Sequence, residues 1–484
     1  MCVATLVHPL NWQLSPRDAI ARWRRDVPLL ALTSGGESPE FDQWTILAPR
    51  TTSMRFDASQ RDARALLHEI RTLAPVCDPA LTSHDHQRLP FASGWIGFIG
   101  YECGALFEPH ATREHGAHSR VRAPRLSARA AVGERATSPW PDAILCRVAR
   151  ALIYSHARGE WFEVGDPNAQ EVASLVGDER NDEHDNSWSP CDGALLHRAA
   201  PTESFTQLVA RTIEFIRAGD IFQANIAQEF HAAFTGSSRA FICDALECAA
   251  PRYGAALELD SDRTLLSLSP ELFLAVDGST RTVTTRPIKG TRPRGNAGAR
   301  GEARVELLAS EKDAAELNMI VDLMRSDLGR VCETGSVRVA RARAIEEHPT
   351  ILHTVAEISG TLAPSADLAT LVAATFPPGS VTGAPKVRAM QIIDELEASR
   401  RGPYCGAIGF SSGCGSALLN VAIRTAALTR DATANQWQID YRAGCGVVEE
   451  SDPRCEDAES LEKTLAMRNI LSLRTAHAHQ SARS

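Results

Sequence analysis

Lys289 is the residue whose neighbours in the sequence most favour a chemical role. Pro287 fixes its own φ, and Gly290 relaxes the steric limits directly after the lysine, so the turn can hold the amine in one direction. A lysine in isolation is usually a solvated surface charge. Two acidic helices, a Ser-Pro-Glu turn and a long glycine-rich segment elsewhere in the chain favour a different interpretation, in which Lys289 is the reactive group of a catalytic site.

Two predicted helices, over residues 312–324 and 456–470, carry acidic side chains on the line of their apolar stripe. Either acidic pair alone would be typical of a solvated helix start, where acids favour the helix dipole. Four carboxylates that face one another cannot all stay ionised without a cation between them. Because the ligands are all oxygens, we expect Mg²⁺, placed to orient a substrate carboxylate. The aligned residues are Asp313 and Glu316 in the first helix and Glu456, Glu459 and Lys463 in the second.

Further candidate residues lie at a strand end, within a strand and in glycine-rich loops. The segment 269–271 (SPE) follows a strand-like run and would present Glu271 at its end. Arg424 is a charge in an apolar run that reads as a strand, so it needs an anionic partner such as a substrate carboxylate. The loop 376–386 lacks the Gly-Lys-Ser/Thr of a nucleotide-binding loop, but its backbone N–H groups suit a carboxylate. A second tight backbone segment, 444–446 (GCG), precedes the second acidic helix.

The composition is that of an ordinary soluble globular protein with room for two to three domains. The chain has 484 residues, 44% hydrophobic and 23% charged, and its net charge of -9 argues against nucleic acid or an anionic membrane as partner. We see no apolar run of about 18 residues and no signal peptide, so we expect no membrane span and a cytoplasmic location. The 12 cysteines lack any Cys-x-x-Cys spacing and are interpreted as reduced thiols. Cys405 is not in the Gly-x-Cys-x-Gly setting of a glutaminase nucleophile, so we expect that the chain does not make its own ammonia.

The chain divides into four regions by composition. Residues 1–165 mix short strands and helices and contain a stretch at about 112–143 that reads as an exposed insertion. Residues 166–198 are polar and acidic and read as a linker. Residues 199–472 carry nearly all the motifs, and residues 473–484 form a polar tail. Strand-like runs separated by helices favour a mixed α+β architecture; they include 144–155, 264–269, 282–285 and 336–339.

As a set, these motifs resemble the chorismate-utilising enzymes, and within that family the aminodeoxychorismate synthase component I branch. The dense resemblance covers about residues 200–472, and a weaker one covers the glycine-spaced segment 94–101. It implies an α+β fold in which large antiparallel sheets are sandwiched by helices. The segments that carry it are 218–225 (AGDIFQAN), 269–271 (SPE), 287–291 (PIKGT), 313–316 (DAAE) with 319–323 (MIVDL), 379–386 (GSVTGAPK) and 456–459 (EDAE) with Lys463.

The resemblance implies that the site aminates chorismate. Lys289 would be the nucleophile that adds to C2 of chorismate as the C4 hydroxyl leaves, and Glu271 would be the general acid that protonates this hydroxyl. Ammonia, supplied by a glutamine amidotransferase subunit, would then attack C4 and expel the lysine. The implied product is 4-amino-4-deoxychorismate, on the route to 4-aminobenzoate and folate.

The resemblance also implies a set of ligands for the metal and the substrate. Glu316 and Glu459 would hold Mg²⁺ directly, and Asp313 and Glu456 would reach it through water. His353 would lie near the substrate ring, although it reads equally well as a buried core histidine. The implied substrate-binding residues are Gln223, His353, Thr382, Gly383, Tyr404, Arg424, Gly444, Gly446 and Lys463.

Two other functions stay open at this point. Anthranilate synthase component I carries alanine where Lys289 stands, and isochorismate or salicylate synthases carry lysine where Gln223 stands, so the pair favours the aminodeoxychorismate branch. A catalytically silent regulator is the third possibility, because some relatives bind tryptophan in their N-terminal half. Retention of inward-facing charges argues against a silent protein; these are Glu271, Lys289, Glu316 and Glu459.

Overall fold

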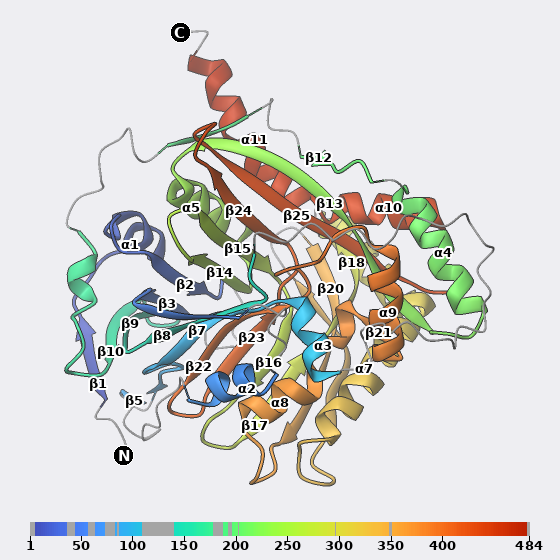
Figure 1. Ribbon diagram of the computed structural model, residues 1–484, viewed down its shortest axis with the longest axis horizontal. Coiled ribbons are helices and arrows are strands. Elements are labelled where there is room, and N and C mark those ends of the chain that lie inside the picture. The colour runs from blue at the N-terminus through green and yellow to red at the C-terminus, as the bar shows by residue number, and fades with distance from the viewer. Residues whose placement is uncertain are drawn as a thin grey trace.

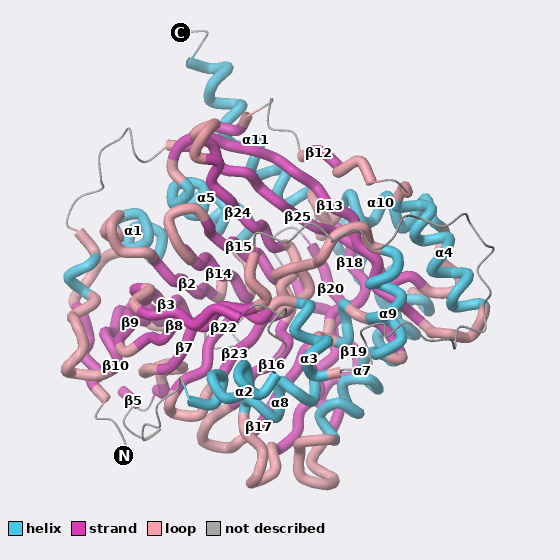
Figure 2. The backbone as a smooth tube through the Cα atoms, in the orientation of Figure 1, coloured by secondary structure: helices cyan, strands magenta, loops and turns pink. Residues whose placement is uncertain are grey.

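Two large antiparallel β-sheets face each other, and helices cover the outer side of each (Figure 1). Figure 2 shows the strands of both sheets at the centre, with helices on opposite sides of them. This arrangement confirms the expected α+β fold of antiparallel sheets sandwiched by helices. The computed structural model describes residues 5–35, 44–56, 63–72, 83–84, 87–108, 140–177, 187–191, 196–201, 203–295, 297–347 and 351–481.

The sheets contain 13 and 10 strands, and a separate small sheet pairs β5 (Ser83–His84) with β6 (Gln87–Arg88). The larger sheet has the order β1 (Leu6–Leu10), β10 (Glu160–Gly165), β9 (Arg150–Ser155), β3 (Trp44–Pro49), β2 (Leu29–Thr33), β14 (Tyr253–Glu258), β15 (Arg263–Ser269), β24 (Thr425–Asp431), β25 (Gln436–Val447), β13 (Gln223–Gly236) and β11 (Trp188–Pro190), and β12 (His197–Arg198) and β21 (Gly383–Ala384) also pair with β13. The smaller sheet has the order β18 (Ile288–Pro293), β20 (Ile351–Thr361), β17 (Thr282–Arg286), β16 (Leu272–Val276), β23 (Ala417–Val421), β22 (Ala407–Ser412), β7 (Gly94–Ile99), β8 (Ala143–Val148) and β4 (Thr52–Phe56), and β19 (Arg338–Glu347) also pairs with β20.

The α-helices of the described residues are α1 (Pro16–Arg22), α2 (Ala63–Thr72), α3 (Gly104–Phe107), α4 (Phe205–Arg217), α5 (Ser238–Ala249), α6 (Ala297–Ala309), α7 (Glu311–Gly329), α8 (Leu368–Thr375), α9 (Lys386–Leu396), α10 (Pro453–Glu462) and α11 (Leu465–Ser481). Helices α1, α5 and α11 pack through apolar side chains on the outer face of the larger sheet. Helices α2, α7 and α8 cover the smaller sheet in the same way. Each helix layer therefore buries one apolar face of a sheet.

A third hydrophobic cluster lies between the two sheets. Leu30, Ile153 and Leu265 of the larger sheet meet Phe98 and Phe410 of the smaller one, and all five are nearly inaccessible to solvent. Strands from early and late parts of the chain lie side by side in both sheets, since β2 pairs with β14 and β7 pairs with β22. The core therefore joins segments that are far apart in the sequence.

The expected strands are found in part: one of them is divided, and the run 336–339 overlaps β19 only from Arg338 onward. Residues 264–269 and 282–285 fall in β15 and β17. The run 144–155 separates at Ala149 into β8 of the smaller sheet and β9 of the larger one, so the chain passes from one sheet to the other within a single residue.

The helix expected over residues 456–470 is wrong as a single element. Helix α10 ends just before Lys463, and α11 begins after Thr464. The Thr464 N–H bonds to the carbonyl of Leu461, three residues back, which tightens the turn. The Lys463 amine bonds to the carbonyl of Gly444 on β25, so the break also anchors the helix end to the sheet.

The division of the chain into four regions stays a prediction. The predicted insertion at 112–143 lies outside the described residues up to position 139, as do 178–186 and 192–195 of the predicted linker. The described parts of this linker supply β11 and β12 to the larger sheet, and Trp188 is buried there.

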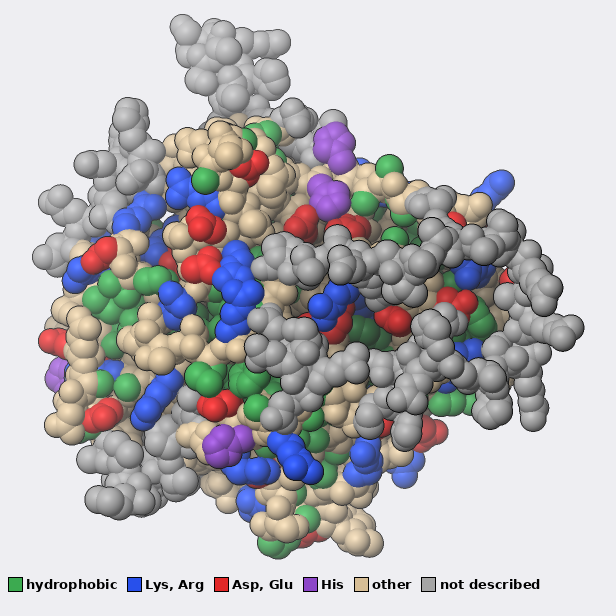
Figure 3. Space-filling view, viewed as in Figure 1, with side chains coloured by type: hydrophobic (Ala, Val, Ile, Leu, Met, Phe, Trp, Pro, Cys, Tyr) green, Lys and Arg blue, Asp and Glu red, His purple; other side chains and the backbone are tan. Residues whose placement is uncertain are grey.

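Acidic and basic side chains are interspersed on the face shown in Figure 3. The described part of that face has no continuous basic surface of the kind that binds nucleic acid. Among the helices that the structure describes, none is both long enough and apolar enough to span a bilayer.

Candidate active site

Lys289 lies on β18 rather than in the turn expected from its neighbours. The register of β18 against β20 shifts at this point, and Gly290 adopts a φ of +80°. A Cβ at Gly290 would come within 2.8 Å of Thr354 Oγ1 and 3.0 Å of Asp313 Cγ. Glycine is therefore required both by the left-handed backbone and by the close approach of α7. The bulge fixes the direction in which the neighbouring lysine points.

Lys289 meets side chains from α7 and from two strands of the larger sheet. Its Nζ lies 3.4 Å from Glu316 Oε2, and both side chains are only 11% exposed. A Cβ added to Gly446 of β25 would stand 2.8 Å from Lys289 Nζ and 2.2 Å from Gln223 Nε2. The Gln223 Oε1 atom is buried and has no hydrogen-bond partner among the described residues. Lys289, Gln223, Gly446 and Glu316 are thus brought together as expected.

Glu271 lies two residues after the end of β15, as the Ser-Pro-Glu segment predicted, and its side chain is buried. Ser380 Oγ donates a hydrogen bond of 2.5 Å to Glu271 Oε1. Burial raises the pKa of Glu271 to about 7, although the Ser380 hydrogen bond and the charge of Lys289 oppose this rise. Glu271 therefore keeps its proton close to neutral pH, as a general acid must.

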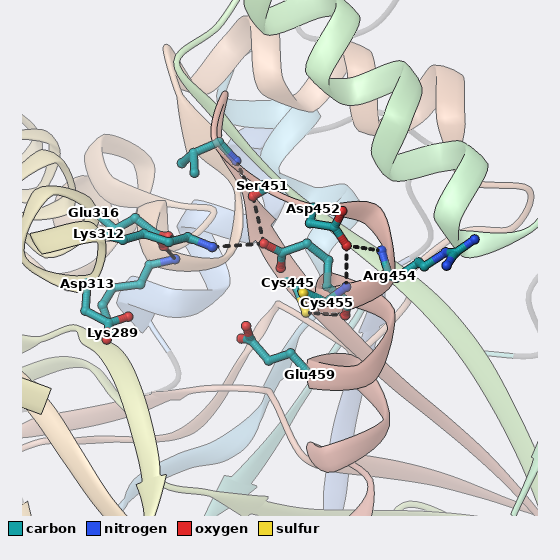
Figure 4. Close-up of polar contacts among 12 residues, drawn as sticks. Lys289, Lys312, Asp313, Glu316, Cys445, Ser451, Asp452, Arg454, Cys455 and Glu459 are labelled. Atoms are coloured by element: carbon teal, nitrogen blue, oxygen red, sulfur yellow. Dashed lines mark hydrogen bonds and ion pairs between the residues drawn. The ribbon is translucent and has the colours of Figure 1, made fainter. Parts of the chain in front are cut away.

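The two acidic helices face each other across the site, as Figure 4 shows for Glu316 on one side and Glu459 on the other. Burial raises the pKa of Glu316 above its ordinary value, against the opposing charges of Lys289 and Lys312. The Lys463 ammonium, 2.8 Å from Glu459 Oε1, is the main cause that lowers the pKa of Glu459. Glu316 and Glu456 are buried, whereas the side chain of Glu459 is 50% exposed. The role of these carboxylates in a metal site stays a prediction.

Lys312 was not identified from the sequence, although it lies one helical turn before Glu316. Its Nζ is 3.0 Å from Glu456 Oε1 and 3.9 Å from Glu316 Oε1, so it lies between carboxylates of both helices. Ser451 Oγ donates a further hydrogen bond of 2.7 Å to Glu456 Oε1. The spacing of four residues between Lys312 and Glu316 was the available signal.

The donor set suits a hard divalent cation. Carboxylates of α7 and α10 stand on opposite sides of one space, and carboxylate oxygens are the ligands that Mg²⁺ prefers. Glu456 and Glu459 offer ligand atoms within 4.8 Å of each other and of Cys445, and Glu316 lies outside this group. Asp313 Oδ2 is buried without a hydrogen-bond donor among the described residues, and its nearest charged neighbour is Arg292 Nη2 at 3.6 Å. Lys312 supplies positive charge between Glu316 and Glu456, where the ion would compete with it.

The glycine-rich loop before α9 joins the start of β13. Gly383 pairs with Ala224, and at its φ of +144° a Cβ would lie 2.2 Å from the carbonyl oxygen of Gln223. Thr382 Oγ1 donates to the carbonyl of Pro378 at 2.8 Å, which holds the loop closed on itself. The loop is therefore fixed beside Gln223.

Tyr404 packs against a buried arginine that the sequence did not single out. Arg401 pairs with Glu397 at 2.6 Å and donates to the backbone carbonyls of Asn225 and Val381. Its guanidinium lies 5.9 Å from the centre of the Tyr404 ring. Because Arg401 bonds to the backbone within the glycine-rich loop and to β13 two residues after Gln223, it positions both. A charged residue in a loop between a helix and a strand gave no periodic signal for this role.

Arg424 lies between β23 and β24 and not within a strand, which corrects the expectation. Its φ is +50°, because the chain passes here from the smaller sheet to the larger one. Burial lowers the pKa of Arg424, and the charges of Tyr441 and Glu271 oppose this effect. Its guanidinium makes no ion pair with any residue that the structure describes, which fits the expected need for an anionic ligand.

His353 and Gly444 were also expected to bind the substrate. His353 lies on β20, next to the strand of Lys289 in the smaller sheet, and Gly444 lies on β25 of the larger sheet. His353 on β20 is buried, and its Nδ1 lies 2.8 Å from Thr291 Oγ1 on β18. Gly444 on β25 accepts a hydrogen bond of 2.8 Å from Lys463 Nζ through its carbonyl. Their contacts to substrate stay predictions.

Comparisons with known proteins agree on one family. A family model described as chorismate binding enzyme matches residues 36–469. Aminodeoxychorismate synthase component 1 of Escherichia coli (strain K12) is 35% identical over 400 residues, which cover 81% of this chain and 80% of that protein. Anthranilate synthase component 1 of Saccharolobus solfataricus is 29% identical over 469 residues, covering 97% and 100%. The crystal structure of anthranilate synthase component I from Streptococcus pneumoniae TIGR4 matches with a TM-score of 0.68 at 27% identity, covering 96% of this chain and 99% of that one.

Proposed function

Because the chain belongs to the chorismate binding enzyme family, we propose that it combines chorismate with ammonia to give 4-amino-4-deoxychorismate. The observation that carries this proposal is the largely buried amine of Lys289, which lies 3.4 Å from Glu316 and shares with Gln223 the space beside Gly446. The family resemblance implies that anthranilate synthases carry alanine at the position of Lys289, and that isochorismate synthases carry lysine at the position of Gln223. The combination of Lys289 with Gln223 therefore supports amination at C4.

The proposed reaction uses Lys289 and Glu271 in sequence. Lys289 Nζ adds to C2 of chorismate, both ring double bonds shift, and the C4 hydroxyl leaves as water after Glu271 protonates it. Ammonia then forms a bond to C4, both double bonds shift back, and the bond between C2 and the lysine nitrogen breaks. The hydrogen bond from Ser380 holds the Glu271 carboxyl in one orientation for its proton transfer.

We propose that the facing carboxylates hold Mg²⁺, with Glu316 and Glu459 as direct ligands and Asp313 and Glu456 acting through water. When bound, the ion orients and neutralises a carboxylate of the substrate. The oxygen donors from two helices support this role. Arg424 would bind a second anionic group of chorismate, because its partly buried guanidinium makes no ion pair with the described residues.

We further propose a cytoplasmic enzyme that works with a second subunit. Similar proteins from two organisms are named component 1 of their synthases, which supports a partner component for this chain. A glutamine amidotransferase is the kind of partner that would supply ammonia, since Cys405 is fully buried and its thiol pKa is raised by burial to about 12.

The test is an assay of the purified chain with chorismate, Mg²⁺ and an ammonium salt, in the absence of any partner. Mass spectrometry should detect 4-amino-4-deoxychorismate, and Lys289→Ala should lose most of it or divert to anthranilate. The control is Arg325→Ala, which removes a positive charge at an exposed position of α7. Lys386→Ala would not serve as a control, because the Lys386 amine is buried in an ion pair with Asp327 and its loss would disturb the fold. Formation of anthranilate by the wild type would refute the proposal and favour the second candidate, anthranilate synthase component I, which the relative from S. solfataricus supports. Formation of isochorismate would refute both candidates.

A further inference from the structure

A group of histidine and carboxylate side chains lies on the larger sheet, well away from the candidate active site. His231 and Glu229 are on β13, and Asp440 faces His231 from β25. His231 is eight residues along β13 from Gln223, which corresponds to roughly 25 Å in an extended strand. All three side chains are partly buried, and their potential ligand atoms lie within 4.8 Å of one another. The proposed amination makes no use of them.

Asp440 fixes the orientation of the His231 ring. His231 Nδ1 lies 2.8 Å from Asp440 Oδ1, so a neutral imidazole donates its N–H there and leaves the lone pair of Nε2 available. Nε2 points toward Glu229, with 3.8 Å between Nε2 and Glu229 Oε1. A carboxylate that holds one nitrogen of a histidine while the other faces a ligand position is the common outer arrangement of protein zinc sites.

Glu229 is also held in place by its other oxygen. Ser399 Oγ donates 2.8 Å to Glu229 Oε2, and Arg442 Nη2 lies 3.2 Å from the same oxygen. Because both partners engage Oε2, Oε1 stays directed to His231. Ligands bound to zinc at about 2.0–2.2 Å in a tetrahedral site lie about 3.4 Å apart, so the separation of 3.8 Å needs only a small adjustment.

A second histidine comes from the edge of the sheet. His197 on β12 is directly opposite His231 on β13. Residues opposite each other in antiparallel strands project to the same face with Cβ atoms about 4.5–5.5 Å apart, so His197 stands on the same face as His231 and Glu229. His197 is exposed, and its ring must turn toward His231 and Glu229 to share an ion with them, because its nitrogens are not within 4.8 Å of both.

We propose that His231 Nε2, Glu229 Oε1 and the His197 imidazole bind a divalent transition-metal ion of the zinc class, with Asp440 orienting His231. Two imidazoles and one carboxylate favour such an ion over Mg²⁺, which prefers oxygen alone. The bound ion joins the short edge strand β12 to β13, and so fixes the segment that leads into α4.

The experiment titrates the full-length chain, freed of metal, with Co²⁺ in the presence of excess Mg²⁺. Excess Mg²⁺ saturates the proposed carboxylate site, so that binding at the histidines is observed separately. We expect one equivalent of Co²⁺ to bind and to give the visible absorption of four-coordinate cobalt, and Zn²⁺ to displace it and raise the Tm. His231→Ala and His197→Ala should remove both effects, and Asp440→Asn should weaken binding by about 10- to 100-fold.

The control is His8→Ala, which removes an exposed strand histidine that lacks this cluster and should leave Co²⁺ binding unchanged. The inference is wrong if no saturable site appears, or if His231→Ala binds Co²⁺ like the wild type; the group is then an ordinary ion-pair network. Amination is followed in parallel and should not change in any of these variants, because none of the residues contacts the candidate active site. Failure of the metal site and failure of the proposed function are therefore separate results.

Discussion

The buried carboxyl of Glu271 makes a quantitative prediction about pH. Its pKa is about 7 in the folded protein, compared with an ordinary value of 4.5, and the first cause is burial. Between these values the folded state binds a proton that the unfolded state has released, so stability falls as pH rises through this window. Each pH unit contributes about 1.4 kcal/mol, which makes the complete loss about 3 kcal/mol above neutral pH.

Glu271→Gln removes this ionisation and keeps an oxygen that can accept the hydrogen bond of Ser380. We expect the variant to gain about 3 kcal/mol relative to the wild type between about pH 5 and pH 8, because only the wild type must ionise a buried carboxyl. The measurement is the free energy of unfolding in urea at a series of pH values. At any single pH, the difference in unfolding free energy between the two proteins also includes changes in packing. The quantity to compare is therefore how this difference changes with pH.

The same ionisation should appear in the rate of amination. We expect kcat/KM of the wild type to fall about tenfold per pH unit above about pH 7, as the general acid loses its proton. The concentration of free ammonia is held constant across the series, because its own protonation would otherwise dominate the profile. Glu271→Gln should be nearly inactive at every pH. A kcat/KM that stays level through neutral pH, together with parallel stability curves, would refute the assignment of Glu271 as a buried acid.

Three further changes test the packing of the site. Gly446→Ala places a methyl group 2.8 Å from Lys289 Nζ, so we expect kcat/KM to fall about 100-fold with an unchanged circular dichroism spectrum; a normal rate would contradict the geometry. Lys312→Met removes the ammonium 3.0 Å from Glu456, so Mg²⁺ measured by calorimetry should bind about tenfold more tightly, and weaker binding would show that the lysine does not compete. Arg401→Met leaves its carboxylate partner buried and unpaired, so urea unfolding should report a loss of about 3–5 kcal/mol, whereas a loss below about 1 kcal/mol would contradict the paired arrangement.

The chemistry-bearing residues were predictable because their signals are local. Carboxylates that continue an apolar stripe must face inward wherever the helix packs, and α7 places Glu316 accordingly. A proline after a strand-like run ends the strand, which placed Glu271 correctly. The antiparallel sheets between helices were expected from the family resemblance, and the structure confirms them.

The features that were missed depend on contacts between distant segments. Gly290 avoids a clash with Asp313 of α7, and no local sequence pattern predicts that this helix comes so close. The segment expected to be a turn is therefore a bulged strand. The break after α10 depends on the bond from Lys463 to β25. Arg424 lies where the chain passes between sheets, and an unbroken apolar run gives no sign of this passage. Lys312 has the surface spacing of an ordinary helix ion pair, and only the approach of α10 distinguishes it.

The pairing of early strands with late ones has a consequence for synthesis on the ribosome. β7 emerges about 300 residues before its partner β22, and at translation rates of about 5–20 residues per second its edge waits roughly 15–60 seconds for that partner. During this interval the apolar strands of both sheets are exposed to solvent, and they can pair with other nascent chains. Expression of either half alone should therefore give a fragment that aggregates. The yield of the full chain should depend on the amount of chaperone available more than on the stability of the folded protein.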